Sequence, residues 1–508
     1  MKMNIRKRTL KFGAEAVAIT VLTIAAIVIL NVAFTALCYR FGWYGDMSAN
    51  LQYAISDDCK DYIEDKIIPK MSDGEKITIL FCDDEDVISA SDTQIYVYES
   101  AKELSELFPD KIQIDFLNVW ENPKRARELG VTHSLDVVVM TSESSSVIKQ
   151  SSLFMTDTTT QTVTAYHGEK RLAAAMMNVV SKDSPMCYVT VNHGETLDSY
   201  ELLYTLADAG YTCTFLDLLN FDIPEDCELL LTVDPKQDMT SGEGGEIVSE
   251  ISKIEAYLDR GGNYMVFLAP ETFAGGGLAN LELMLEGWGV DFAHSKGESG
   301  SEEYYQIKDS SHAVSIDGYT IFGETNFGGH AGNVFDKDSK SAIFKNATAI
   351  NVAEGYSSIG NGEYSATLDG RERVFSPLIS SYSSAEAYAG GKVVKRASDG
   401  AFTLMSMTRQ SYNGNESRVV VCASTGFAEE SVMQSVVYGN SEVISSVAKD
   451  MGRDGAPYML SAKPFPTTEM KSITTRAATV IMVSITAVFA LAAIICGAVI
   501  LTRRKNAL

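Results

Sequence analysis

The chain has 508 residues, which exceeds a typical single domain and predicts two or three domains, each able to bury a core. Its 42 basic and 67 acidic residues give a net charge of −25, which argues against a nucleic-acid partner. The sequence contains neither a GxxxxGK[ST] phosphate-binding loop nor a GxSxG nucleophile motif, so we expect neither ATP hydrolysis by this chain nor a serine triad.

Two long apolar segments lie near the ends of the chain, at residues 16–38 and 477–502. Each is long enough to cross a hydrocarbon layer of roughly 30 Å as a helix. The short tails outside them, residues 1–15 and 503–508, are basic, which predicts that both termini are cytoplasmic. A cleaved signal peptide is the alternative for the first segment, but the segment is too long and no small-x-small site follows it.

We therefore expect a protein of the cytoplasmic (inner) membrane with two spans in contact with lipid and an exterior region over residues 41–475. That region carries 32 basic and 66 acidic residues, a net charge of −34. Acidity of this kind is typical of a solvated surface, and an acidic binding patch is the alternative.

Residues 41–165 predict a first α/β unit. Strand-like runs KITILFC, KIQIDFLNV and LDVVVM alternate with helices over Tyr96–Phe108 and from Pro123, in an order similar to a thioredoxin-type layout. The sequence Phe81-Cys82-Asp83-Asp84 stands where a redox motif would be needed, so we expect no thiol chemistry there.

Residues 166–465 predict a second α/β unit with a doubly wound, mostly parallel sheet. Strands CYVTV, TCTFL, LLLTV and YMVFL alternate with helices, one of which places Ile247, Ile251, Ile254 and Leu258 on a single face before Gly261-Gly262. From residue 271 onward the chain is rich in Gly, Ser and Asn, and we expect a loop-rich continuation with short strands such as AFTLMSM and RVVVCAS, and helices near residues 278–286 and 441–451.

Two His-Gly-Glu triplets, His167–Glu169 and His193–Glu195, each precede a predicted helix. We interpret both as helix starts, because a carboxylate is favoured at the amino end of a helix, and Asp198 and Glu201 have capping-box spacing after the second triplet.

The alternative is a ligand crevice, since strand-to-helix loops form such crevices in open α/β sheets. The candidate ligand or partner surface is then His193, Gly194, Glu195 and Asp234, the last of which follows strand LLLTV. Neither triplet has the HExxH spacing of a zinc site, so we expect no metal and no cofactor. The exterior cysteines lack CxxC pairs, and whether they form disulfides is open.

Longer stretches carry a family resemblance: VTVNHGET, LLYTLADAGYTCTFLDL, IPEDCELLLTVDPKQDMTSGE, IEAYLDRGGNYMVFLAP and VVVCASTGFAEE. Together with the RFGWYGDMSANLQYAIS segment after the first span, they resemble GldG-like auxiliary proteins of ABC transport systems over nearly the whole chain. The resemblance implies a membrane-anchored accessory subunit that works with a separate ABC permease and ATPase, and it brings no catalytic residues. Asn192 replaces the first glycine of the family's Gly-His-Gly-Glu turn, which argues against close approach of a ligand to this loop.

We therefore expect a non-catalytic auxiliary subunit of an ABC transport system whose cargo the sequence does not reveal. In the second span Ala493 and Gly497 lie four residues apart, a spacing that favours close helix packing, although both residues facing lipid is the alternative. Two rival functions are a membrane-tethered hydrolase or carbohydrate-active enzyme that uses Glu195 or Asp234, and an envelope sensor or scaffold that works without a transporter.

Overall fold

The computed structural model describes residues 54–465, except 157–159, 161, 182–184, 198–199, 243–247, 270–276, 298–301, 436, 454–456, 458–459 and 461, and it also describes residues 25, 29 and 32. Apart from those last three residues, the predicted spans at 16–38 and 477–502 lie outside the described residues, as do both tails and the pair Ala493 and Gly497. Within the described part of the chain, no helix has the length and apolar character needed to cross a membrane.

The first unit is built on a four-stranded sheet with the order β2-β1-β3-β4. Strand β1 pairs in parallel with β2 and antiparallel with β3, and β3 pairs antiparallel with β4. The strands are β1 (Ile77–Phe81), β2 (Ile112–Phe116), β3 (Val137–Met140) and β4 (Ser145–Ile148), and the helices are α2 (Asp57–Tyr62), the π-helix η1 (Ile63–Ile67), the 3-10 turn η2 (Ile68–Lys70), α3 (Glu85–Ser89), α4 (Gln94–Leu107), α5 (Pro123–Glu128) and α7 (Gly168–Val180).

Apolar spacing explains how these elements pack. Helix α4 buries Val97, Ala101 and Leu104, which are four and three residues apart and therefore lie on one face. Helix α7 buries nearly its whole surface, and its residues Leu172 and Met176 belong to the same core cluster as the sheet. The core of the first unit therefore includes α7, which follows the predicted division between residues 165 and 166.

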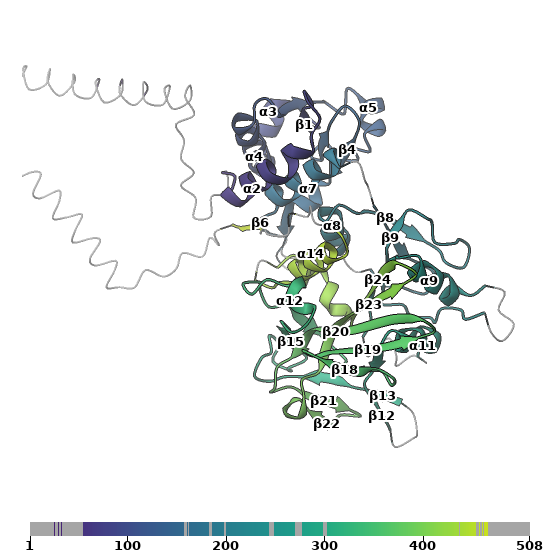
Figure 1. Cartoon of the computed structure of the whole chain (residues 1–508). Helices are drawn as coiled ribbons and strands as arrows, with labels where there is room; N and C mark the ends of the chain where they lie inside the picture. The colour runs from purple at the N-terminus through teal and green to yellow at the C-terminus, as the bar shows by residue number, and fades with distance from the viewer. Residues whose placement is uncertain are drawn as a thin grey trace, which may run out of the picture.

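A small three-stranded sheet with the order β25-β6-β5 joins the last described segment of the chain to the first unit. Strands β5 (Phe154–Thr156) and β6 (Val163–Tyr166) follow the short helix α6 (Gln150–Leu153), whereas β25 (Lys463–Pro464) comes from the far end of the chain. The last described segment thus packs on the first unit (Figure 1).

The second unit contains five parallel strands in the order β8-β7-β9-β10-β24. They are β7 (Met186–Thr190), β8 (Thr212–Leu216), β9 (Cys227–Val233), β10 (Asn263–Phe267) and β24 (Asn415–Cys422). One face is covered by α8 (Tyr200–Asp208) and α14 (Asn440–Asp450), and the other by α9 (Glu250–Asp259) and α11 (Ala279–Gly287). Figure 1 shows α8 and α14 between the sheet and the first unit.

The same sheet continues in antiparallel fashion beyond β24, along the path β16-β15-β20-β23-β24. Its further strands are β11 (Val290–Phe292), β15 (Thr320–Thr325), β16 (Ile343–Lys345), β17 (Ile350–Val352), β18 (Ser357–Gly360), β19 (Glu363–Leu368), β20 (Arg371–Ser381) and β23 (Thr403–Tyr412). The α/β class is confirmed, but a mostly parallel sheet is not: among the described strands of this sheet, parallel pairing joins only five, because the second half of the chain forms hairpins rather than crossovers.

Three hairpins of this antiparallel half have two-residue loops whose sequences suit tight turns. Asn361-Gly362 joins β18 to β19, Asp369-Gly370 joins β19 to β20, and Asn413-Gly414 joins β23 to β24. Both residues of each pair have positive φ, as two-residue type I′ turns require.

The remaining elements lie around this sheet. They are β12 (His294–Lys296), β13 (Glu302–Tyr304), β14 (Gln306–Lys308), β21 (Glu386–Ala389), β22 (Lys392–Arg396), α12 (Ala331–Val334), η3 (Ala397–Asp399), η4 (Thr425–Ala428) and α13 (Glu430–Met433). Strands β12 and β13 form one small sheet, and β14, β21 and β22 form another.

Candidate functional site

The predicted candidate residues meet where the order of the parallel strands reverses. The chain passes from β7 to β8 on one side and then crosses to β9 on the other side of β7. In open α/β sheets, the carboxyl ends of two such strands form the usual ligand crevice. His193, Gly194 and Glu195 follow β7, and Asp234 follows β9, so the structure brings all four to this switch point.

The His193 ring is held between two carboxylates. Its Nδ1 lies 3.2 Å from Glu195 Oε1, and its Nε2 lies 3.1 Å from Glu250 Oε2. The backbone N–H of His193 also donates to Glu195 Oε2 over 2.7 Å. Glu250 in turn accepts from the backbone N–H of Thr240 over 2.9 Å, which fixes its orientation.

This arrangement makes His193 a buried cation. Burial alone would lower its pKa, but hydrogen bonds and charge from Glu195 and Glu250 raise the pKa of His193 to about 10. Burial would raise the pKa of each carboxyl, yet contact with His193 holds the pKa of Glu195 and of Glu250 below their ordinary values. At neutral pH both ring nitrogens therefore carry protons and donate them to carboxylates, so the ring has no free lone pair with which to accept a proton.

Asp234 is engaged within the same crevice. Its Oδ2 accepts from Thr196 Oγ1 over 2.7 Å and from Lys236 Nζ over 2.6 Å, and its backbone has a φ of +51°. The carbonyl of His193 accepts from the backbone N–H groups of Lys236 and Gln237, over 2.7 and 2.9 Å. The loops after β7 and β9 are thus joined to each other by main-chain and side-chain bonds.

Gly194 allows these two loops to approach. Its φ is +72°, and a β-carbon at this position would stand 3.1 Å from Lys236 Cβ. Asn192, which precedes His193, has a φ of +83°, a conformation that asparagine tolerates better than most residues. Asparagine at position 192 therefore fits this turn, and Asn192 Nδ2 donates to Asp217 Oδ2 over 2.5 Å.

The helix-start interpretation is confirmed for the first triplet. Helix α7 begins at Gly168 with Glu169 in its first turn. After the second triplet, residues 196 and 197 are not helical, the described part of α8 covers Tyr200–Asp208, and Glu195 contacts the His193 ring. The sequence did not reveal the role of Glu250, which lies 57 residues after His193 and is the first residue of helix α9.

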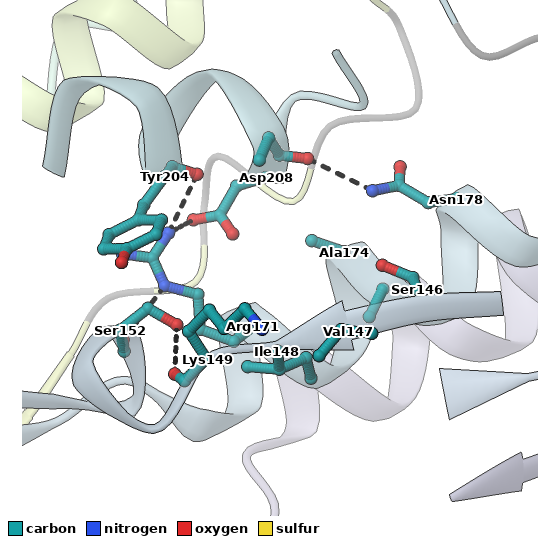
Figure 2. A pocket seen from close by; sticks show the side chains of 12 residues that line it. Ser146, Val147, Ile148, Lys149, Ser152, Arg171, Ala174, Asn178, Tyr204 and Asp208 are labelled. Carbon is teal, nitrogen blue, oxygen red and sulfur yellow. Dashed lines mark hydrogen bonds and ion pairs between the residues drawn. The ribbon is translucent and has the colours of Figure 1, made fainter. Parts of the chain in front are cut away.

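A second cluster of charged residues, which the sequence did not reveal, joins the two units. Arg171 of α7 donates through Nη2 to Glu201 over 2.5 Å and through Nη1 to the Tyr204 carbonyl over 3.0 Å. It also pairs with Asp208, and its Nε donates to the Ser152 carbonyl over 3.1 Å (Figure 2). Burial raises the pKa of Glu201 and lowers the pKa of the neighbouring Lys170.

A pocket of about 70 Å³ lies beside this cluster, between α7, α8 and β4 (Figure 2). Lys149, Asn178 and Ala207 are among the residues that line it. Such a volume has room for about two water molecules and is well below the several hundred cubic ångströms of a small-molecule site. The pocket is therefore a gap in the contact between the units.

Glu169, two residues before Arg171, holds the two ends of the described chain together. Its carboxylate accepts from the backbone N–H and from the Oγ of Ser56, both over 2.8 Å. Lys463 donates to the same carboxylate and to the Ala54 carbonyl. The first turn of α7 therefore binds both chain ends through Glu169 and the second unit through Lys170 and Arg171.

Cys82 lies where a thioredoxin-type redox motif would be needed, and it is fully buried. Burial raises its pKa to about 12, so its thiol stays protonated at neutral pH. Within the described segments, no group of three or more His, Cys, Asp or Glu side chains is arranged to hold a metal ion.

Comparison with known protein families finds no match, and comparison with curated proteins finds none either. Among solved structures, the chain is similar to the mmIFT52 N-terminal domain, with 11% identity, 53% of this chain and 97% of that chain covered, and a TM-score of 0.37. A cytoplasmic protein from Salmonella typhimurium shows 11% identity, 52% and 98% coverage, and a TM-score of 0.29. PurLQS from Thermotoga maritima shows 14% identity, 52% and 97% coverage, and a TM-score of 0.25. TM-scores this low support no inference about function.

Proposed function

We propose that this chain is a membrane-anchored, non-catalytic auxiliary subunit of an ABC transport system. Residues 41–475 form its exterior module, which contacts the permease, the cargo or the envelope, and the partner ATPase supplies the nucleotide hydrolysis. The basic tails and the resemblance to GldG-like proteins support this assignment and a location in the cytoplasmic membrane.

The observation that carries the proposal is the meeting of Ser56 and Lys463 at Glu169. These two residues lie on the segments that lead toward the two predicted spans. Because the two ends of the folded module lie close together, the module can be attached to two neighbouring membrane helices. Such an attachment suits contact with a permease in the same membrane.

The strand order supports a finer description of the two units. In the first, the order β2-β1-β3-β4 with α7 packed on the sheet supports a thioredoxin-like layout. In the second, the helices on both faces of five parallel strands support the doubly wound description. Neither description brings a catalytic group with it.

The enzyme alternative is weakened by the state of its two candidate carboxylates. Glu195 accepts from His193, and Asp234 accepts from both Thr196 and Lys236. A general base or nucleophile needs a carboxylate oxygen that substrate can reach. These contacts support a structural role for the switch-point residues in the joined loops.

Purification of the tagged full-length protein in mild detergent tests the partnership. We expect an ABC permease and ATPase to co-purify, and we expect Gly497→Leu to reduce their recovery by disturbing helix packing. Ala492→Leu is the control, because residue 492 lies on a different face of the predicted helix. Recovery of this protein alone, in several detergents and after cross-linking in intact membranes, would support the scaffold or enzyme alternatives.

Labelling of intact cells tests the topology separately. In a Cys213→Ala background, which removes the half-buried native thiol, an impermeant maleimide should label Ser358→Cys, whose position is exposed, and should not label Lys505→Cys. The opposite pattern would reverse the proposed topology.

A further inference from the structure

Two cysteines face each other on neighbouring strands of the parallel sheet. Cys187 of β7 and Cys213 of β8 are paired positions in the strand register, so their side chains point to the same face. Both pack in the cluster beneath α8, and the Cys213 Sγ lies 3.9 Å from the Leu203 carbonyl. Cys213 is near enough to raise the pKa of the Cys187 thiol.

The spacing of neighbouring strands allows these thiols to be joined. Paired strands lie about 4.8 Å apart, within the Cα separation of roughly 4.4–6.8 Å that disulfides span. The two β-carbons of a relaxed disulfide are about 3.8 Å apart, which is less than the spacing of paired strands. A disulfide between paired strand positions is therefore strained. Strained disulfides are the more easily reduced ones, which makes such a bond reversible.

The two thiols differ in access. Cys187 is fully buried, whereas Cys213 is half-buried on β8, the strand at the edge of the sheet. The third nearby cysteine, Cys227 of β9, packs in the core cluster on the opposite face of the sheet, with Tyr257. Cys213 is therefore the thiol that a reagent reaches first, and Cys187 is its nearest partner.

We propose that Cys187 and Cys213 form a reversible disulfide that fastens the edge strand β8 to β7. Its formation in the cell rests on the exterior location given above, because disulfides persist in oxidising compartments. The Cys213 thiolate attacks a disulfide of an external thiol–disulfide oxidant and releases one thiolate. Cys187 then attacks the mixed disulfide at Cys213 and releases the second, so two protons and two electrons pass to the oxidant.

The environment of Cys187 suits this order of events. Contact with Cys213 and burial raise the pKa of Cys187 well above its ordinary value, so little of it is thiolate in the folded protein. Because the thiolate is the nucleophile, Cys187 reacts only once its partner sulfur is already in a mixed disulfide beside it.

Peptide mapping of the purified full-length protein tests the pairing. The protein is treated with oxidised glutathione or with dithiothreitol, free thiols are blocked with N-ethylmaleimide, and the chain is digested with Glu-C protease. Cleavage after Glu195, Glu201 and Glu225 places Cys187, Cys213 and Cys227 on three separate peptides. We expect a linked pair that contains Cys187 and Cys213 and disappears on reduction, with a Tm about 5 °C higher in the oxidised protein.

Two variants control this experiment. Cys227→Ala should keep the linked pair, and Cys213→Ala should lose both the pair and the Tm difference. Separate alkylation of Cys187 and Cys213 after oxidation of the folded protein, or a link from either to Cys227, would overturn the proposal.

Trapping of thiols in intact cells separates this proposal from the proposed location. A linked pair in cells supports both. If Ser358→Cys labels from outside and the pair is nevertheless reduced in cells, the disulfide proposal is wrong. If labelling instead places the module in the cytoplasm, the topology is wrong, while a linked pair in the purified protein still supports the pairing of these thiols.

Discussion

Lys463 and Glu169 form a buried ion pair between side chains that are 294 residues apart in the sequence. Ser56 binds the same carboxylate, so one residue of α7 orders both ends of the described chain. Since the segment of each end leads toward a predicted span, this contact determines how those segments leave the folded module.

Glu169→Gln should destabilise the first unit by about 3 kcal/mol, because it leaves the buried Lys463 ammonium without the opposing charge of Glu169. Hydrogen exchange in α2 and α7, together with denaturant unfolding, measures the effect. Glu64→Gln is the matched control, since Glu64 is exposed. The double variant Glu169→Gln/Lys463→Met should recover part of the loss, and an equal or greater loss would contradict an ion-pair origin.

Arg171→Ala should cost about 4 kcal/mol, because Glu201 and Asp208 would both lose their buried guanidinium partner. The amides of α8 should exchange faster, since Arg171 is on α7 and both carboxylates are on α8. The control is Arg125→Ala, which removes a solvent-exposed pair with Glu128 and should change stability by less than about 1 kcal/mol. Unchanged exchange in α8 would show that the cluster does not couple the units.

The stability contributed by His193 should depend on pH in a defined direction. Its folded-state pKa is raised to about 10, above the unfolded value of about 6.5. The contribution is therefore complete below about pH 6.5 and is lost as the pH rises through about 10. The difference in unfolding free energy between the native protein and His193→Asn should shrink over that range, and a difference that grows with pH would contradict the assignment.

The stability contributed by the carboxylates around His193 depends on pH in the opposite direction, and this dependence appears at low pH. The pKa values of Glu195 and Glu250 are lowered on folding. Their contribution is present above the unfolded pKa of about 4.5 and is lost as the pH falls through the lower folded values. Titration of both carboxyl groups by NMR checks the direction of each shift.

Gly194→Ala should destabilise the second unit more than Gly74→Ala destabilises the first. Both glycines have φ near +75°, at +72° and +77°. Alanine in this left-handed conformation is destabilised by about 1 kcal/mol at either position. Only at Gly194 does the new β-carbon press against Lys236, which stands 3.1 Å away, whereas nothing lies within 4 Å at Gly74. Equal losses in thermal unfolding would show that the loops after β7 and β9 are not packed as described.

Local patterns predicted the parallel half of the second unit well. The runs CYVTV, TCTFL, LLLTV and YMVFL became β7, β8, β9 and β10. Strands β9 and β10 are buried almost throughout and read as continuous apolar segments, whereas the edge strand β8 is mostly exposed or half-buried. The antiparallel half was harder, since most of its strands have only three to six residues, although β20 and β23 are long and largely buried. The signal that identifies it is the turn chemistry of Asn361-Gly362, Asp369-Gly370 and Asn413-Gly414.

The sequence predicted which residues form the candidate site but not the partners that these residues contact. His193, Gly194, Glu195 and Asp234 were placed correctly at strand ends, because the carboxyl ends of parallel strands share one edge. The partners that define their roles were not predicted: Glu250 lies on α9, and the Arg171 cluster joins two units. A side-chain pair between distant elements leaves no periodic trace in sequence.

Strand β24 has a consequence for synthesis of the chain on the ribosome. It pairs on one side with β10, which ends at Phe267, and on the other with β23, and it is complete only at Cys422. At about 5–20 residues per second, the roughly 150 residues between those points take on the order of 10–30 seconds to emerge. During that time the apolar edge of β10 that later pairs with β24 has no strand beside it, which leaves this edge open to pairing with another chain.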